Sequence, residues 1–531
     1  MTTGVDLAVD GNHAIVAPVL VPLVTAIITL AVRRHGRLQR AVSLVGVCGY
    51  AAAVAVLGIV VWQTGVAPYQ LSAWPAPFGI SLVGDALSAF MLGIAAAVAV
   101  PTLAYAALSV GDAGQRIAFH TLVHFLLAGV SGAFLTGDVF NLFVWFEVML
   151  LPSYALVAHY GGGEHLDAAL KYTVLNLVGS AVMLLGVGGL YATTGTLNMA
   201  DMAHRLANAE RYGVDPAATL VVGMILISVF ALKAGLVPFQ FWVPDAYAAA
   251  PAPVTALLAG VTKKVGLYAI ARLTFTVFAA GTLGSGTPFL AIIGPALFLM
   301  AAASILLGGI GAVDRDTVDG VLAYSSISQA GFIALPLAIA ATAPSTTIRT
   351  LGVAAALVYA LNHSLAKATL FLIAGVLRDR VGSDAFEALG GLASRSPSLS
   401  AAFLIGALAL VGIPPLVGFF GKLFVFDTAG QTFAAGGAGG STALAVALIG
   451  ATLSIAYVTR AWNRGFWGEA SPAVVDASWP TGRIGIIAVL ALAIIGVGIG
   501  FDPIVRAAQA GAEAAVSADG RYVDAVLGVS G

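Results

Sequence analysis

One lysine lies in an apolar stretch where a membrane-embedded ammonium group would need a chemical purpose. The sequence has no formal charge between Asp215 and Lys233, and Pro238 follows five residues after the lysine. A charge in the hydrocarbon core costs roughly 3 kcal/mol even on lenient insertion scales, so Lys233 is predicted to face protein or water. Pro238 removes a backbone donor and is predicted to break the helix. A charge beside a broken helix indicates a transport protein.

Other ionisable side chains occur in equally apolar surroundings. Pro414 and Pro415 precede Lys422 and predict a second broken helix. His363 and Lys367 are four residues apart, so on a helix they share one face about 6 Å apart along the axis. The residues that we expect to form one polar axis for protons are Glu147, Lys233, Lys264, His363, Lys367 and Lys422. We expect Glu147 to pair with Lys233, either functionally or as a structural ion pair that holds two helices together.

Lys263 and Lys264 are adjacent, so on a helix their side chains start about 100° apart. We therefore expect only one of them to face the polar axis. Arg272 follows two turns later, and we expect its side chain to extend to the outer membrane interface.

Weaker candidates lie in two other apolar stretches. His120 and His124 repeat the four-residue spacing, but a buried histidine is usually a hydrogen-bonded core residue rather than a proton carrier. The polar residues expected either to order water between charged sites or to form hydrogen bonds between helices are Tyr324, Ser325, Ser326, Ser328 and Gln329.

The composition defines the class of protein. The 531 residues are 60% hydrophobic and 9% charged, against about 25% charged in soluble domains, so the chain is predicted to be an all-α polytopic membrane protein. A net charge of -1 provides no basic surface for nucleic acid, and the lone Cys48 excludes an internal disulfide. With few carboxylates for a metal cage, no phosphate loop and no nucleophile triad, we expect no cofactor and no enzymatic reaction. Protons and small cations fit the polar axis best.

Hydropathy predicts about fourteen transmembrane helices, because a bilayer core about 30 Å thick needs roughly 20 apolar residues per helix. The expected spans are 13–32, 41–62, 85–109, 117–136, 139–160, 168–192, 218–242, 246–275, 288–310, 317–341, 348–377, 398–426, 441–464 and 483–501.

The two lysine-bearing breaks fall in spans 7 and 12, which suggests two inverted five-helix repeats, spans 4–8 and 9–13. The single membrane domain, 1–531, would then divide into 1–116, a first repeat 117–275, a second repeat 288–464, and a last span with its tail, 483–531. Most loop arginines, including Arg33 and Arg34, fall on one side of the membrane. Since cytoplasmic loops carry this excess, both termini are predicted to lie outside.

Several long motifs resemble the antiporter-like membrane subunits shared by respiratory complex I and the multisubunit Mrp sodium/proton antiporters. The motifs are FNLFVWFEVMLLPSYAL, ALKAGLVPFQFWVPDAYAAAPAPVTALLAG, KVGLYAIARL, AYSSISQAGF, NHSLAKATLFLIAG and GIPPLVGFFGKLFVF. Within that family, DAYAAAPAPVTAL is most similar to the D-type members of Mrp complexes. The resemblance implies fourteen helices, membership of a larger complex, and roles for four residues. Glu147 and Lys233 would be the switching pair, Lys264 the central relay, and Lys422 the proton-exchanging group of the second half.

These observations predict a proton-translocating subunit of a multisubunit monovalent cation/proton antiporter in the cytoplasmic (inner) membrane. Its expected partners are other membrane subunits, protons, and Na⁺. A proton-pumping subunit of complex I or a related hydrogenase is the closest alternative. A self-sufficient solute transporter and a structural scaffold are further alternatives. The exchanged cation, its path and any bound metal stay open.

Overall fold

The structure is a computed structural model that describes residues 11–111, 114, 118–159, 161–437, 439–516 and 520–528. The predicted domain boundary between residues 116 and 117 and both chain ends lie outside these ranges.

The N-terminal part consists of three long helices and one β-hairpin. The hairpin pairs its strands antiparallel, with Ala67 opposite Gly84. The elements are α1 Gly11–Ala31, α2 Gly36–Thr64, β1 Ala67–Gln70, the short helix Leu71–Ala73, β2 Ser81–Gly84 and α3 Ala86–Ser109.

The next part contains the first helix break and two wide π-helical turns. The elements are α5 Phe119–Leu135, α6 Val139–Val157, α7 Gly163–Thr194, α8 Met199–Ala207, α9 Ala209–Tyr212, α10 Pro216–Ala234, α11 Trp242–Ala249, α12 Ala252–Leu257, the π-helix Leu258–Thr262, α13 Lys263–Arg272, the π-helix Leu273–Val277 and the short helix Phe278–Ala280.

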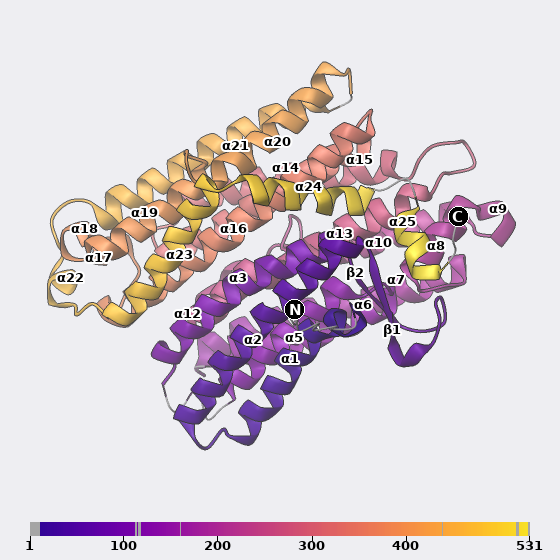
Figure 1. The fold of residues 1–531 in the computed structure, drawn as a ribbon. Helices are drawn as coiled ribbons and strands as arrows, with labels where there is room; N and C mark the ends of the chain where they lie inside the picture. The colour runs from indigo at the N-terminus through magenta and orange to yellow at the C-terminus, as the bar shows by residue number, and fades with distance from the viewer. Residues whose placement is uncertain are drawn as a thin grey trace, which may run out of the picture.

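The C-terminal part contains the second break and an amphipathic helix, α24, that packs on α16 and α3. Figure 1 shows α24 running across the bundle, between α1, α2 and α5 on one side and α19 to α21 on the other. The elements are α14 Leu290–Val313, α15 Val318–Thr342, α16 Thr346–Val381, α17 Phe386–Leu389, α18 Leu392–Arg395, α19 Pro397–Val411, α20 Val417–Ala434, α21 Gly440–Ala461, the π-helix Trp462–Phe466, α22 Pro472–Asp476, α23 Thr481–Ile499, α24 Asp502–Val516 and α25 Arg521–Leu527.

Each of the fourteen predicted spans coincides with a helix or a helix pair. In the described part of the chain, twelve helices are individually long and apolar enough to cross a membrane. The expected span 117–136 matches α5, which has only 17 residues, and the expected span 398–426 matches the broken pair α19 and α20. The multi-pass helical architecture predicted from hydropathy is therefore confirmed.

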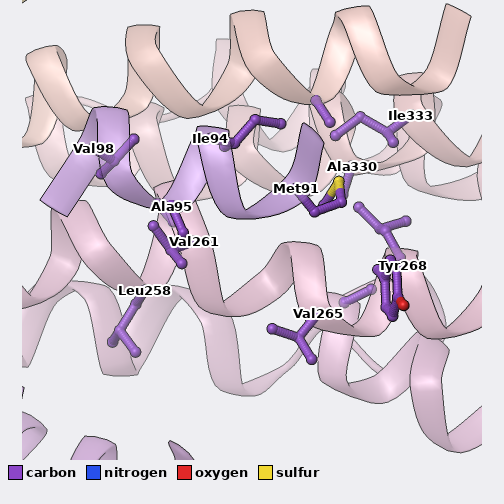
Figure 2. Close-up of a cluster of buried hydrophobic side chains, with 14 of the residues drawn as sticks. Met91, Ile94, Ala95, Val98, Leu258, Val261, Val265, Tyr268, Ala330 and Ile333 are labelled. Carbon is purple, nitrogen blue, oxygen red and sulfur yellow. The ribbon is translucent and has the colours of Figure 1, made fainter. Parts of the chain in front are cut away.

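Three spans form the centre of the bundle and are almost entirely enclosed by other helices: Ala252–Ala280, α15 and α16. Figure 2 shows how their apolar side chains pack, with Met91 and Val98 of α3 beside Val261, Val265 and Tyr268 of the 252–280 span. The other spans expose part of their surface, as expected for helices that face lipid. Polar groups on the three central spans are therefore shielded from lipid by protein.

The first helix break follows Lys233 directly, as predicted. Gly235 ends α10 with φ +66°, a conformation that residues with a Cβ rarely adopt. The side chain of Ser304 accepts the Val237 N–H at 2.8 Å, and the Trp242 indole donates to the Leu232 carbonyl at 2.9 Å. Side chains thus satisfy backbone groups that the break removes from the helical pattern.

The second break, between α19 and α20, is satisfied in the same way. Gly412 has φ +93° and ends α19. The side chain of Asn362 donates to the Ala409 carbonyl at 3.2 Å, and the Lys422 amine donates to the Val411 carbonyl at 3.0 Å. At this break the Lys422 amine itself supplies a hydrogen-bond donor for a backbone carbonyl that the break leaves without a helical partner.

The prediction that Arg272 extends to the membrane interface was wrong. Its side chain is only 2% exposed and forms a two-pronged ion pair with Asp85, with nitrogen to oxygen distances of 2.6 and 2.7 Å. The guanidinium also lies over the rings of Tyr268 and Tyr522. A buried carboxylate at the start of α3 offers a stronger partner than the interface, because charge-assisted bidentate pairs gain strength in a low dielectric.

Candidate proton-transfer site

Lys233 and Glu147 are connected through a hydroxyl group rather than by direct contact. The Lys233 amine donates to Ser180 Oγ at 3.0 Å, and the Ser180 hydroxyl donates to Glu147 Oε1 at 2.5 Å. The amine also donates to the Asn176 carbonyl at 3.0 Å. Both hydrogen bonds through Ser180 run in the same direction, so a proton leaving Lys233 can be matched by one arriving at Glu147.

Packing between α6, α7 and α10 holds these three groups in place. Gly186 of α7 allows close approach of α10, because a Cβ at that position would lie 2.7 Å from the Leu226 side chain. Phe146 of α6 stacks on Phe230 of α10 with ring centroids 5.8 Å apart. Lys233 is 4% exposed, whereas Glu147 is only half-buried. The Glu147 carboxylate therefore lies near the surface of the helix bundle, and the Lys233 amine lies inside the bundle.

Lys263 and Lys264 both reach one hydrogen-bonded cluster, so the prediction that only one faces the polar axis was wrong. Lys263 donates to the Ser326 carbonyl at 3.2 Å, and Lys264 contacts His363 Nδ1. Ser326 Oγ lies 3.5 Å from His363 Nε2 and closes the cluster. Two long side chains that start about 100° apart can converge when a single serine and histidine pair lies between them.

A π-helical turn precedes the two lysines and supplies an extra acceptor. The Lys264 amine donates to the Ala259 carbonyl at 2.5 Å, within the π-helix Leu258–Thr262. Such wide turns recur at functional sites because they leave backbone groups outside the regular pattern. The Lys263 amine packs on Gly235, where an added Cβ would lie 3.2 Å from Nζ. This contact brings the cluster beside the first helix break.

Lys367 joins the same region through the neighbouring serine. Its amine donates to Ser325 Oγ at 2.6 Å and to the Leu322 carbonyl at 2.8 Å. His363 and Lys367 lie on one face of α16, as their spacing predicted, and both are 0–1% exposed. Lys263, Lys264 and Lys367 are all buried in this region, and like charges in a low dielectric repel strongly. Protonation of one lysine therefore disfavours protonation of the others.

Beyond this cluster, Gln329 connects α15 to two tyrosines. Its amide nitrogen donates to the Tyr457 hydroxyl at 2.8 Å and to Ser454 Oγ at 3.3 Å, and its oxygen accepts from Tyr359. These groups are fully buried and come from α15, α16 and α21. They form a buried, hydroxyl-bearing group contributed by three helices of the second half of the chain.

The buried lysines form a row, and Lys422 lies at its far end. The lysines of the row are Lys233, Lys263, Lys264, Lys367 and Lys422. Its amine donates to the Val411 carbonyl and lies 4.9 Å from the centroid of the Phe332 ring, a cation–π contact. Phe332 in turn packs against Tyr359, with centroids 5.5 Å apart. Ser325, Gln329 and Phe332 follow one another along α15 at helical spacing, so α15 presents successive contacts for the lysines.

Among the described residues, no direct hydrogen bond links Lys233 to Lys263 or Lys367 to Lys422. Proton transfer across those gaps would therefore need water. Within the same described residues, no group of three or more His, Cys, Asp or Glu side chains is arranged to hold a metal ion.

Sequence reasoning missed Ser180 and Asn176. A serine in an apolar helix carries no charge and therefore gives no signal in the sequence. Knowledge that α7 packs against α10 would have been needed to infer that Ser180 faces α10. Of the five polar residues expected to order water or join helices, Ser325, Ser326 and Gln329 contact charged or hydroxyl groups of the row. Ser328 donates to the Ile305 carbonyl, and Tyr324 lies under Arg315, so both belong to helix packing.

Comparison with known proteins identifies the family. Residues 136–443 match the family described as NADH:quinone oxidoreductase/Mrp antiporter, transmembrane. The chain belongs to this family. Its matched region contains Glu147, Lys233, Lys264 and Lys422 together with both helix breaks.

Individual family members are similar over most of the chain. The D-type Na(+)/H(+) antiporter subunit of Alkalihalophilus pseudofirmus is 36% identical over 93% of this chain and 95% of its own. The N-type NADH-quinone oxidoreductase subunit of Desulforudis audaxviator is 36% identical over 76% of this chain and 79% of its own. A chain in the solved Mrp complex from Dietzia sp. DQ12-45-1b superposes with a TM-score of 0.85 at 27% identity, covering 97% of this chain and 99% of that one.

Proposed function

We propose that this family member is the proton-translocating membrane subunit of a multisubunit Na⁺/H⁺ antiporter, and that protons move along the buried lysines. The observation that carries the proposal is the hydrogen-bonded sequence Lys233, Ser180, Glu147, because it joins a buried ammonium to a carboxylate at the edge of the chain. The high similarity to a D-type Na(+)/H(+) antiporter subunit over nearly the full chain supports the sodium/proton class.

In this proposal, the charge of Lys233 depends on the state of Glu147. When Ser180 passes its proton to Glu147 and takes one from Lys233, an ion pair becomes two neutral groups. The positive charge that stood at the end of α10 is then gone, so Lys263, which packs on Gly235, can hold a proton at lower electrostatic cost. A proton that Lys263 takes up from water can then pass to His363 and Lys264, which lie in the same cluster.

The second half would continue the relay through Lys367, Gln329 and the two tyrosines to Lys422. Hydroxyl and amide groups do not store protons at neutral pH, but they orient water between groups that do. We assign the exchange of protons with one side of the membrane to Lys422. We further propose that the breaks at α10/α11 and α19/α20 mark two inverted repeats, 117–275 and 288–464, and that both termini lie outside the cytoplasmic membrane.

The test is exchange activity of the assembled complex in liposomes. Lys233→Ala is expected to abolish sodium-driven proton movement while the complex still assembles, because the neutral side chain cannot bind a proton. Lys171→Ala is the matched control, since Lys171 is exposed and pairs with Asp245 away from the row. Exchange at the wild-type rate in Lys233→Ala would remove the core of the proposal.

A redox-driven proton pump is a second candidate, favoured by the similarity to an N-type NADH-quinone oxidoreductase subunit. The same row of lysines would serve either machine, because neither needs a redox group in this chain. Purification of the native assembly distinguishes them. Flavin and iron–sulfur subunits would indicate the redox complex, and small hydrophobic partner subunits would indicate the antiporter.

A further inference from the structure

A second group of buried proton-carrying side chains lies between α2 and α5, apart from the row of lysines. The Ser43 hydroxyl of α2 lies 2.9 Å from His120 Nδ1 and 3.0 Å from His124 Nε2, both on α5. All three side chains are 0% exposed. One hydroxyl thus bridges two imidazoles that face it from successive turns of one helix.

The bridging geometry dictates what this group can do. A hydroxyl has one hydrogen, so Ser43 donates to one imidazole and accepts from the other. When the hydrogen bonds reverse, a proton leaves Nδ1 of His120 and one arrives at Nε2 of His124, or the converse. Each ring must then gain or lose a proton at its other nitrogen. Imidazole is the side chain best suited to this exchange near neutral pH.

The two outer nitrogens are the atoms that lack a protein partner. His120 Nε2 and His124 Nδ1 are both buried and accept or donate no hydrogen bond to any protein group in the described residues. Buried polar atoms without partners are rare, and ordered water usually supplies the missing bonds. A bound cation fits less well, because the guanidinium-bearing Arg40 stands one turn before Ser43 on the same helix and like charges repel.

Further polar side chains lie on both sides of Ser43, His120 and His124 along the α2–α5 interface. Arg40, one turn before Ser43 on α2, is half-buried and lies near the start of that helix. Two turns beyond Ser43, the Ser131 hydroxyl of α5 donates to the Tyr50 hydroxyl of α2 at 3.2 Å. The histidines therefore lie between Arg40, near the start of α2, and a hydroxyl pair farther along the same interface.

We propose that His120, Ser43 and His124 form a second proton relay, completed by water molecules bound at the two outer imidazole nitrogens. This relay carries protons between solvent on the Arg40 side and the lysines of α10 to α20, to which no direct hydrogen bond joins it among the described residues. Its effect on transport rests on the proposed antiporter function, whereas its bound water does not.

The first test is structural and independent of transport. In a high-resolution cryo-electron microscopy map of the assembled complex, we expect water density within about 3.2 Å of His120 Nε2 and of His124 Nδ1. A map that resolves ordered water elsewhere in the bundle but leaves both nitrogens against apolar atoms would overturn the relay, whatever the transport activity.

The second test measures proton movement by the complex in liposomes. Ser43→Ala is expected to slow it at least about tenfold, because the bridge between the imidazoles is lost. Ser43→Thr keeps the hydroxyl and should retain most of the rate. Ser228→Ala is the control, since among the described residues the Ser228 hydroxyl bonds only to the Met224 carbonyl of its own helix.

The outcomes separate the relay from the proposed function. Equal rates in Ser43→Ala and wild type would overturn the relay, and equal slowing in Ser43→Ala and Ser43→Thr would show a packing role and also overturn it. Absence of sodium-driven proton movement in wild type would reject the antiporter function alone. In that case the water density at the two histidines still decides the relay.

Discussion

Lys233 and Glu147 share one hydroxyl, that of Ser180, which accepts from the amine and donates to the carboxylate. A direct ion pair would hold both charges in place, because breaking it would leave two uncompensated charges in the membrane. An intervening hydroxyl permits the same two residues to be either charged or neutral with little movement. Under the proposed function, this relationship would let a pair predicted from sequence switch between charged and neutral states.

Removal of the Ser180 hydroxyl should uncouple the pair. We expect Ser180→Ala to reduce proton exchange of the reconstituted complex by about 10²-fold, the lower range for losing a positioned proton carrier. The measurement is the initial rate of pH change in liposomes after a sodium jump, normalised to the amount of assembled complex.

The matched variant for this position is Ser180→Thr, which retains the hydroxyl. It should keep most of the activity if proton transfer is the role. If Ser180→Ala exchanged as fast as wild type, Lys233 and Glu147 would have to communicate by some other route.

The Ser326 hydroxyl should contribute more to the rate of proton exchange than the hydroxyl of its near neighbour Ser328. Ser326 lies between Lys263 and His363, whereas Ser328 donates to the Ile305 carbonyl and touches no charged group of the row. We expect Ser326→Ala to slow exchange at least about tenfold and Ser328→Ala to leave it near the wild-type rate. Similar rates for both variants would count against the cluster as the central relay.

Lys422 combines a charge with a structural contact, and two substitutions separate these contributions. Lys422→Arg preserves the charge and can still donate to the Val411 carbonyl, but it cannot release a proton, so we expect folding without exchange. Lys422→Met removes both and should also lower the melting temperature of the complex. Exchange at the normal rate in Lys422→Arg would show that this residue does not carry protons.

The Asp85–Arg272 pair is predicted to stabilise the fold rather than to move protons. Asp85→Asn leaves the fully buried guanidinium without its counter-charge and should cost about 3–5 kcal/mol of unfolding free energy. Asp502→Asn removes the partner of Arg506 in an exposed pair and should change stability by at most about 1 kcal/mol. The measurement is thermal denaturation of the purified complex, in which the fraction of subunits that stay assembled is recorded against temperature for each variant. Equal melting temperatures for the two variants would contradict this assignment.

Apolar length and the cost of buried charge were sufficient to predict most of the architecture. Helices were expected where about 20 apolar residues follow one another, and the prolines after Lys233 and before Lys422 were expected to break them. The ionisable residues had to turn inward because lipid does not solvate them. These are local constraints, so they can be read from one stretch at a time.

The connections between those residues depended on which helices pack together, and no local pattern carries that information. Ser180 bridges Lys233 and Glu147 only because α7 lies between α6 and α10, and Arg272 is buried only because the start of α3 places Asp85 beside it. The sequence by itself determined that this chain crosses the membrane many times with titratable groups inside. The tertiary structure alone decided their partners, because hydrogen bonds depend on distances of a few ångströms between segments far apart in the chain.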